Sequence, residues 1–172
     1  MIRIRHILAA LVLTFAALVP LPSMAGALDN YGENKLIDAL LRGQSIGTPA
    51  SWYIALYTDT CTEGAAGTEV STSGTAYARQ AVTASLANWA GTQSAGSTVA
   101  SSGTNGTTSN NGAITWTQST AAWGNLQSVG FTDAATAGNR WICINLTTPS
   151  NVSAAGVTVS LPAWSLQFQI DN

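Results

Sequence analysis

The chain has 172 residues, of which only 8% are charged: six Lys and Arg, eight Asp and Glu, with a single His. The length suits one domain with a single core, and the scarcity of basic residues disfavours nucleic-acid binding. Typical soluble domains have about 25% charged residues. The composition therefore favours an assembly with a surface of small neutral polar groups and subunit contacts, and it disfavours a freely diffusing enzyme.

The first 27 residues have the order of regions found in a secretory signal peptide. Two arginines precede an apolar block at 7–19 that contains Thr14 as its one polar residue, and prolines and small residues follow. The block is shorter than the ~20 residues that span a bilayer, so we expect no permanent membrane anchor. We predict cleavage after Ala25 or Ala27, with residues 28–172 forming one domain. The alternative is that translation starts at Met24 and the leader is never made.

Removal of the leader would also remove His6, the single histidine of the chain. Four basic residues would then remain against eight acidic ones. Without histidine, the chain has no imidazole for a catalytic triad, a zinc site or a proton shuttle at neutral pH. We therefore predict no catalytic residues and no cofactor.

Residues 29–42 are predicted to form an amphipathic helix, because apolar residues recur there near a period of 3.6. The apolar residues are Leu28, Tyr31, Leu36, Ile37, Leu40 and Leu41. Asp29 or Asn30 can cap the amino end, and Gly43 stands where a helix-terminating glycine is common. We expect this helix to lie against a sheet or a neighbouring subunit.

After Pro49 the apolar residues alternate with a period of two, which is typical of half-buried strands. The predicted strands are 51–58, 77–86, 113–118, 126–134, 140–147, 156–161 and 165–170. Turn-forming residues separate several of them, at 110–112, 137–139 and 148–151. The fold class predicted is mainly β: an antiparallel β-sandwich or jelly-roll with one N-terminal amphipathic helix.

Two segments lack this alternation. Residues 59–74 form a Gly- and Thr-rich loop, and residues 90–112 form a Ser, Gly, Thr and Asn tract whose one large apolar residue is Val99. The second segment is long enough to be either a mobile loop or a partner-binding surface.

Cys61 and Cys143 are the two cysteines of the chain. An even pair behind an export signal predicts a disulfide. The alternative is two unpaired thiols, with Cys143 packed as a small hydrophobe in its strand.

Four acidic residues could in principle form a glycosidase pair or bind calcium: Asp59, Glu63, Glu69 and Asp133. All of them stand in turn-like sequence, and none belongs to a calcium-loop motif. We interpret them as solvated loop acids and predict no metal site.

The six tryptophans raise the question of carbohydrate binding, since indole faces stack on sugar rings. Trp52, Trp116 and Trp141 stand in predicted strands and are interpreted as core or subunit-interface residues. Trp89 borders the 90–112 tract and is the candidate for contact with a ligand such as a glycan.

Three segments carry a resemblance to a known family. They are "ENKLIDALLRGQ" at 33–44, "GTEVS" to "YARQAV" at 67–82, and "TAAWG" to "VGFTDAATAGN" at 120–139. In this order they resemble a family of small tailed-phage and prophage structural proteins, described as tail-fibre or virion-surface proteins. The resemblance implies a β-rich, non-catalytic and oligomeric virion protein, with no catalytic residues to carry over.

The leading functional prediction is thus a tail-fibre or virion-surface component, or its prophage-derived descendant, that acts by self-association and surface contact. Its expected partners are copies of itself and virion or cell-surface proteins. The alternative is an exported bacterial binding module, lectin-like, that works in the periplasm or outside the cell after signal cleavage. A third hypothesis is a secreted hydrolase, which is disfavoured because the chain has no histidine once the leader is removed.

Overall fold

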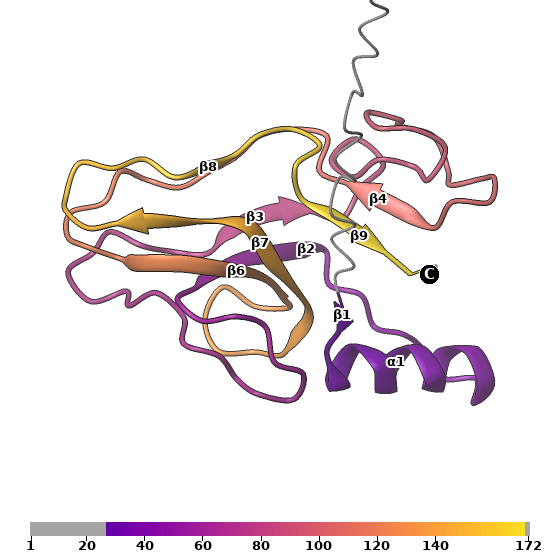
Figure 1. Cartoon of the computed structure of the whole chain (residues 1–172). Helices are drawn as coiled ribbons and strands as arrows, with labels where there is room; N and C mark the ends of the chain where they lie inside the picture. Colours follow the sequence, from indigo (N-terminus) through magenta and orange to yellow (C-terminus); the bar gives the residue numbers. More distant parts are fainter. Residues whose placement is uncertain (1–26, 171–172) are drawn as a thin grey trace, which may run out of the picture.

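The structure is a computed structural model that describes residues 27–170 (Figure 1). The predicted signal peptide, apart from Ala27, lies outside the described residues and stays a prediction. Within residues 27–170, no helix is long and apolar enough to cross a membrane.

The described chain is mainly β, with one helix near its amino end. The elements are β1 (Ala27–Leu28), α1 (Asn30–Leu41), β2 (Ser51–Tyr57), β3 (Gln80–Thr83), β4 (Thr107–Ser109), β5 (Ile114–Thr115), β6 (Gly124–Thr132), β7 (Arg140–Val152), β8 (Ser160–Leu161) and β9 (Gln167–Gln169). They form a five-stranded sheet in the order β1-β7-β6-β2-β3 and two ladders, β4-β9 and β5-β8. Each pairing is antiparallel. The predicted class is confirmed, while the finer assignment to a sandwich or jelly-roll stays a prediction.

The core lies mainly against the central strands β2, β6 and β7. Its largest fully buried side chains are Trp116, Ile54, Leu56, Leu126, Ile144 and Leu166. Trp141 is also buried in the core, and its ring packs edge-on against Trp52 with 5.4 Å between the centroids. Trp116 and Trp141 thus take the interior positions that their strands predicted.

Several element bounds differ from those predicted. The strand expected at 77–86 is limited to β3, which pairs with β2 only over residues 80–83. β4 lies inside the polar 90–112 tract, where no apolar alternation marks it. The turn predicted at 148–151 is wrong: β7 continues to Val152, and a shift in its pairing with β6 accommodates the extra residues.

The helix begins and ends where the sequence predicts. The side chain of Asp29 caps it by accepting a hydrogen bond from the Asn30 N–H, and Gly43 follows the helix with a φ of 66°. This left-handed conformation suits glycine, because it has no Cβ to clash.

The first turn of α1 approaches β7 so closely that Gly32 is required. A Cβ at this position would lie 2.6 Å from the Trp141 carbonyl oxygen, and Tyr31 packs edge-on against the Trp141 ring at 5.2 Å. We expect Gly32→Ala to lower the free energy of unfolding by ~1–3 kcal/mol, since an overpacked contact must open. Thermal denaturation followed by circular dichroism measures this effect.

The matched control is Asn34→Ala, an exposed position on the same helix. Alanine favours a helix more than asparagine does, so this variant should be as stable as the parent or slightly more stable. Equal melting temperatures for Gly32→Ala and the parent protein would contradict the close approach.

Candidate interaction site

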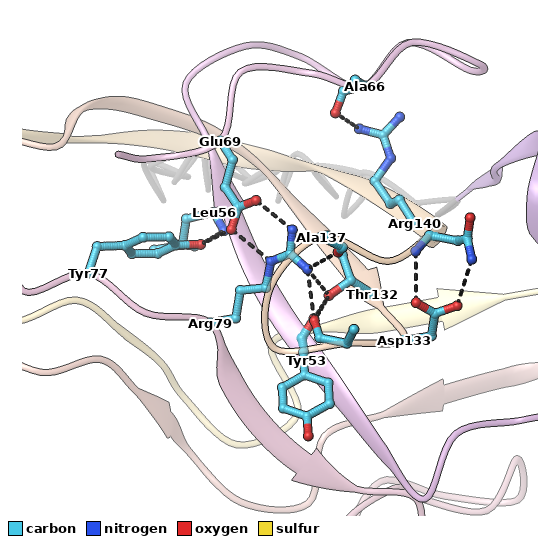
Figure 2. A network of polar contacts seen from close by, with 12 residues as sticks. Tyr53, Leu56, Ala66, Glu69, Tyr77, Arg79, Thr132, Asp133, Ala137 and Arg140 are labelled. Atoms are coloured by element: carbon cyan, nitrogen blue, oxygen red, sulfur yellow. Dashed lines mark hydrogen bonds and ion pairs between the residues drawn. The ribbon is translucent and has the colours of Figure 1, made fainter. Parts of the chain in front are cut away.

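A network around Arg79 holds the 69–79 segment against the end of β6 (Figure 2). The guanidinium makes a two-pronged ion pair with Glu69, with Nε–Oε1 at 2.8 Å and Nη2–Oε2 at 2.7 Å. Its Nη1 donates to the Thr132 hydroxyl and to the carbonyls of Ala134 and Ala137. The prediction that Glu69 is a solvated loop acid is therefore wrong: it is half-buried and paired.

Tyr77 extends this network into the core. Its hydroxyl donates to Glu69 Oε1 at 3.0 Å and accepts from the Leu56 N–H at 2.8 Å. Burial raises the pKa of Tyr77 far above its usual value and outweighs the Leu56 hydrogen bond, which lowers it. The hydroxyl is therefore protonated at neutral pH. Through its two hydrogen bonds, Tyr77 joins the Glu69–Arg79 pair to the backbone of β2.

A second junction centres on Asp29, which joins α1, β7 and the 59–69 loop. Its Oδ2 accepts from Arg140 Nε at 2.6 Å, and its Oδ1 accepts from the Gly64 N–H at 2.9 Å. Arg140 also donates to the loop carbonyls of Thr62 and Ala65, and to that of Ala66, as Figure 2 shows. Both partners of the ion pair are buried, at 7% and 10% side-chain exposure.

The predicted disulfide joins the same loop to β7. Cys61 and Cys143 are bonded, with their Cα atoms 5.7 Å apart. The Cys61 N–H also donates to the side-chain oxygen of Asn145 at 2.7 Å, so the loop is held to β7 by covalent and polar contacts together.

Of the three remaining candidate acids, Asp59 and Asp133 make local hydrogen bonds. Burial acts to raise the pKa of Asp133, but hydrogen bonds from Asn139 and Trp141 together lower it below the usual value. Asp59 accepts from the Thr68 N–H, and Glu63 is exposed. Among residues 27–170, no three His, Cys, Asp or Glu side chains gather in a way that could hold a metal ion.

The last turns of α1 leave an apolar surface uncovered. Ile37, Leu40 and Leu41 are 51%, 72% and 81% exposed, and their spacing puts them on one side of the helix. We call these three residues the α1 stripe. Only the amino-terminal part of the helix therefore fulfils the expectation that it lies against the sheet.

Trp89 lines an open pocket of ≈ 570 Å³. The aromatic side chains Trp52, Trp89 and Phe168 contribute to its wall, and Leu86 and Ile170 stand at its exposed edge. We call this cavity the Trp89 pocket. The Trp89 ring is half-buried and packs against Phe131 at 5.3 Å, and its indole nitrogen is covered and has no hydrogen-bond partner.

The 90–112 tract supplies one side of this pocket and has a defined course. β4 pairs with β9, and buried Asn110 fixes the end of the tract. The Asn110 side chain donates to the carbonyls of Gly112 and Pro162, both at 2.8 Å, and accepts from the Leu166 N–H at 2.9 Å. In the sequence, Trp89 is marked by its place beside the polar tract, whereas Trp52 and Phe168 are far from it along the chain, and this distance conceals that the three side chains converge.

The described part of the chain is thus an antiparallel β-rich structure whose loops are held by ion pairs and a disulfide, with an uncovered apolar helix surface. A model of the family described as podophage GP4 fiber I protein gp80 matches residues 27–169, and the chain belongs to that family. The matched range includes all three segments on which the predicted resemblance rests, so that resemblance is confirmed. None of the curated proteins compared with the chain matches it.

Proposed function

We propose that the chain is a non-catalytic subunit of a phage fibre or virion surface, or a prophage-derived descendant of one, and that it self-associates through the α1 stripe. The observation that carries this proposal is the exposure of Ile37, Leu40 and Leu41 in a member of a phage fibre family. The proposed partners are copies of the same chain and other virion or cell-surface proteins.

Burial of the α1 stripe would supply a useful part of the association free energy. A fully buried Leu or Ile side chain contributes ~1.5–3 kcal/mol. In a symmetric contact each residue of the stripe is buried on both copies, so its contribution is made twice. Such a contact sets identical surfaces against each other, which suits an apolar stripe better than a charged one. The Arg42–Asp38 ion pair on the same helix is exposed and can remain solvated at the edge of the contact.

The test is the mass of the protein in solution, measured by light scattering after size exclusion. We expect an oligomer for the parent and a smaller species, down to the monomer, for the double variant Leu40→Gln/Leu41→Gln. Val157→Gln is the matched control, because Val157 is 37% exposed and lies outside the helix. A parent that is monomeric at tens of micromolar, or a double variant of unchanged mass, would refute the proposal.

The second candidate function is an exported binding module, and the Cys61–Cys143 disulfide favours it. Disulfides persist in oxidising compartments and are rare in the cytosol. Intact mass spectrometry of native protein from the medium, the cell envelope and purified particles separates the two candidates. A mass starting at Gly26 or Leu28 in the medium or envelope indicates export, whereas one starting at Met24 or Ala25 in particles indicates a virion component.

A further inference from the structure

We infer that the Trp89 pocket is a binding site for one unit of a neutral saccharide. The inference goes beyond the proposed self-association, because it concerns a different surface from the α1 stripe. It rests on the aromatic wall of the pocket, on its lack of charge, and on hydroxyl groups held at its polar side.

The aromatic wall offers carbon surface to a ligand. Trp52, Trp89 and Phe168 are each only partly buried although they pack against the core. Because the indole nitrogen of Trp89 is covered, the ring can offer a ligand only its carbon atoms. A pyranose has C–H groups on one face that pack on such rings, whereas its hydroxyls need polar neighbours at the edge.

The lack of charge narrows the class of ligand. None of the residues lining this pocket, all within the described part of the chain, has a charged side chain. A phosphate, a carboxylate or an ammonium group would enter without a counter-charge and lose its hydration. A neutral ligand avoids this penalty, and ≈ 570 Å³ lies within the range of small-molecule pockets, roughly 300–1,000 Å³.

Three hydroxyls are held in place on the polar side. Thr92 Oγ1 donates to the Ser102 carbonyl at 3.0 Å and Thr108 Oγ1 donates to the Ala90 carbonyl at 2.7 Å. Both oxygens can therefore still accept. Ser101 Oγ accepts from the Thr92 N–H at 3.3 Å, which leaves its own O–H free to donate. The pocket thus presents both acceptors and a donor, which is what sugar hydroxyls require.

An apolar occupant fits these groups less well. Leu86 and Ile170 at the edge are exposed and would accept a side chain from a second copy of the chain. Such a side chain would cover the hydroxyls without pairing with them, which is unfavourable. A saccharide pairs with them and covers the aromatic wall at the same time.

The experiment is saturation-transfer NMR on the full chain with the methyl pyranosides of glucose, galactose and mannose. Methyl glucuronide and cyclohexanol are the charged and the apolar comparison ligands. We expect at least one neutral pyranoside to bind with a dissociation constant on the order of millimolar, and more tightly than both comparison ligands. The absence of transfer to all three sugars, or equal transfer to cyclohexanol, overturns the inference.

Variants locate the binding. We expect Thr92→Val to weaken sugar binding about five- to tenfold by removing one hydroxyl, and Trp89→Phe to retain an aromatic surface and bind within about threefold of the parent. Trp164→Ala is the matched control: Trp164 is 53% exposed and does not line the pocket, so binding should be unchanged. If Trp164→Ala and Thr92→Val lose sugar affinity equally, or if Thr92→Val loses none, the assignment is overturned.

The Leu40→Gln/Leu41→Gln background separates this inference from the proposed self-association. Sugar binding should persist there, because neither residue lines the pocket. A parent protein that is monomeric yet binds the sugar refutes self-association alone, whereas a parent that is oligomeric without sugar binding refutes the pocket alone.

Discussion

Replacement of Arg140 by methionine is expected to lower the free energy of unfolding by about 3–5 kcal/mol, the range for removing one partner of a buried ion pair. The loss is large because the Asp29 side chain would lose its ion-pair partner at a site with little solvent around it. Three carbonyls of the 59–69 loop would also lose their donor. Equilibrium denaturation in urea measures the change.

The chain offers a matched control for this prediction in Arg42→Met. Arg42 pairs with Asp38 at 2.9 Å, a distance close to that of the buried pair, but the Arg42 side chain is 71% exposed. Exposed pairs contribute at most about 1 kcal/mol, so the control should unfold almost as the parent does. Similar decreases in the free energy of unfolding of both variants would show that burial does not set the strength of the Arg140–Asp29 pair.

Removal of the disulfide by Cys61→Ser/Cys143→Ala is expected to lower the free energy of unfolding by about 4 kcal/mol on the chain-entropy model. The bond closes a loop with a sequence separation of 82, and an unfolded chain without it has many more conformations. Thermal denaturation of the parent and the double variant checks this, each with and without a reductant.

Reductant is the internal control for that experiment. It should lower the stability of the parent towards that of the double variant and leave the double variant unchanged, since no other cysteine exists in the chain. A parent whose melting temperature does not respond to complete reduction, verified by thiol titration, would refute the prediction.

The sequence was most informative where structure is determined locally. The capping residue Asp29 and the terminating Gly43 bound the helix in the structure as predicted, because caps act through bonds to their own neighbours. The class of the fold followed from side-chain alternation, which depends on the geometry of each strand alone.

It was least informative where distant residues converge. Glu69 has the local surroundings of a loop acid, yet Arg79 and Tyr77 fold back onto it. β4 forms because its backbone finds β9 more than fifty residues later, and its polar side chains carry no sign of this pairing.

The same limit applied to the candidate sites. Trp89 was identified by its position beside the polar tract, whereas the other two aromatic side chains of its pocket, Trp52 and Phe168, come from β2 and β9. The periodicity of the helix predicted an apolar side. Whether that side packs on the sheet depends on how far β7 extends along the helix, and the sequence does not show this. Gly32 marks the place where the two backbones meet, and the α1 stripe lies beyond it.

The disulfide also has a mechanical consequence for a chain that belongs to a fibre family. When tension is applied at the two ends, force passes from Cys61 to Cys143 through the sulfur bridge, and the segment between them bears no load. At about 3.3–3.6 Å per residue, a separation of 82 residues corresponds to roughly 280 Å of chain that stretching cannot release while the bond is intact. β3, β4, β5 and β6 all lie within this shielded segment, so under tension the described part of the chain would lengthen only outside residues 61–143.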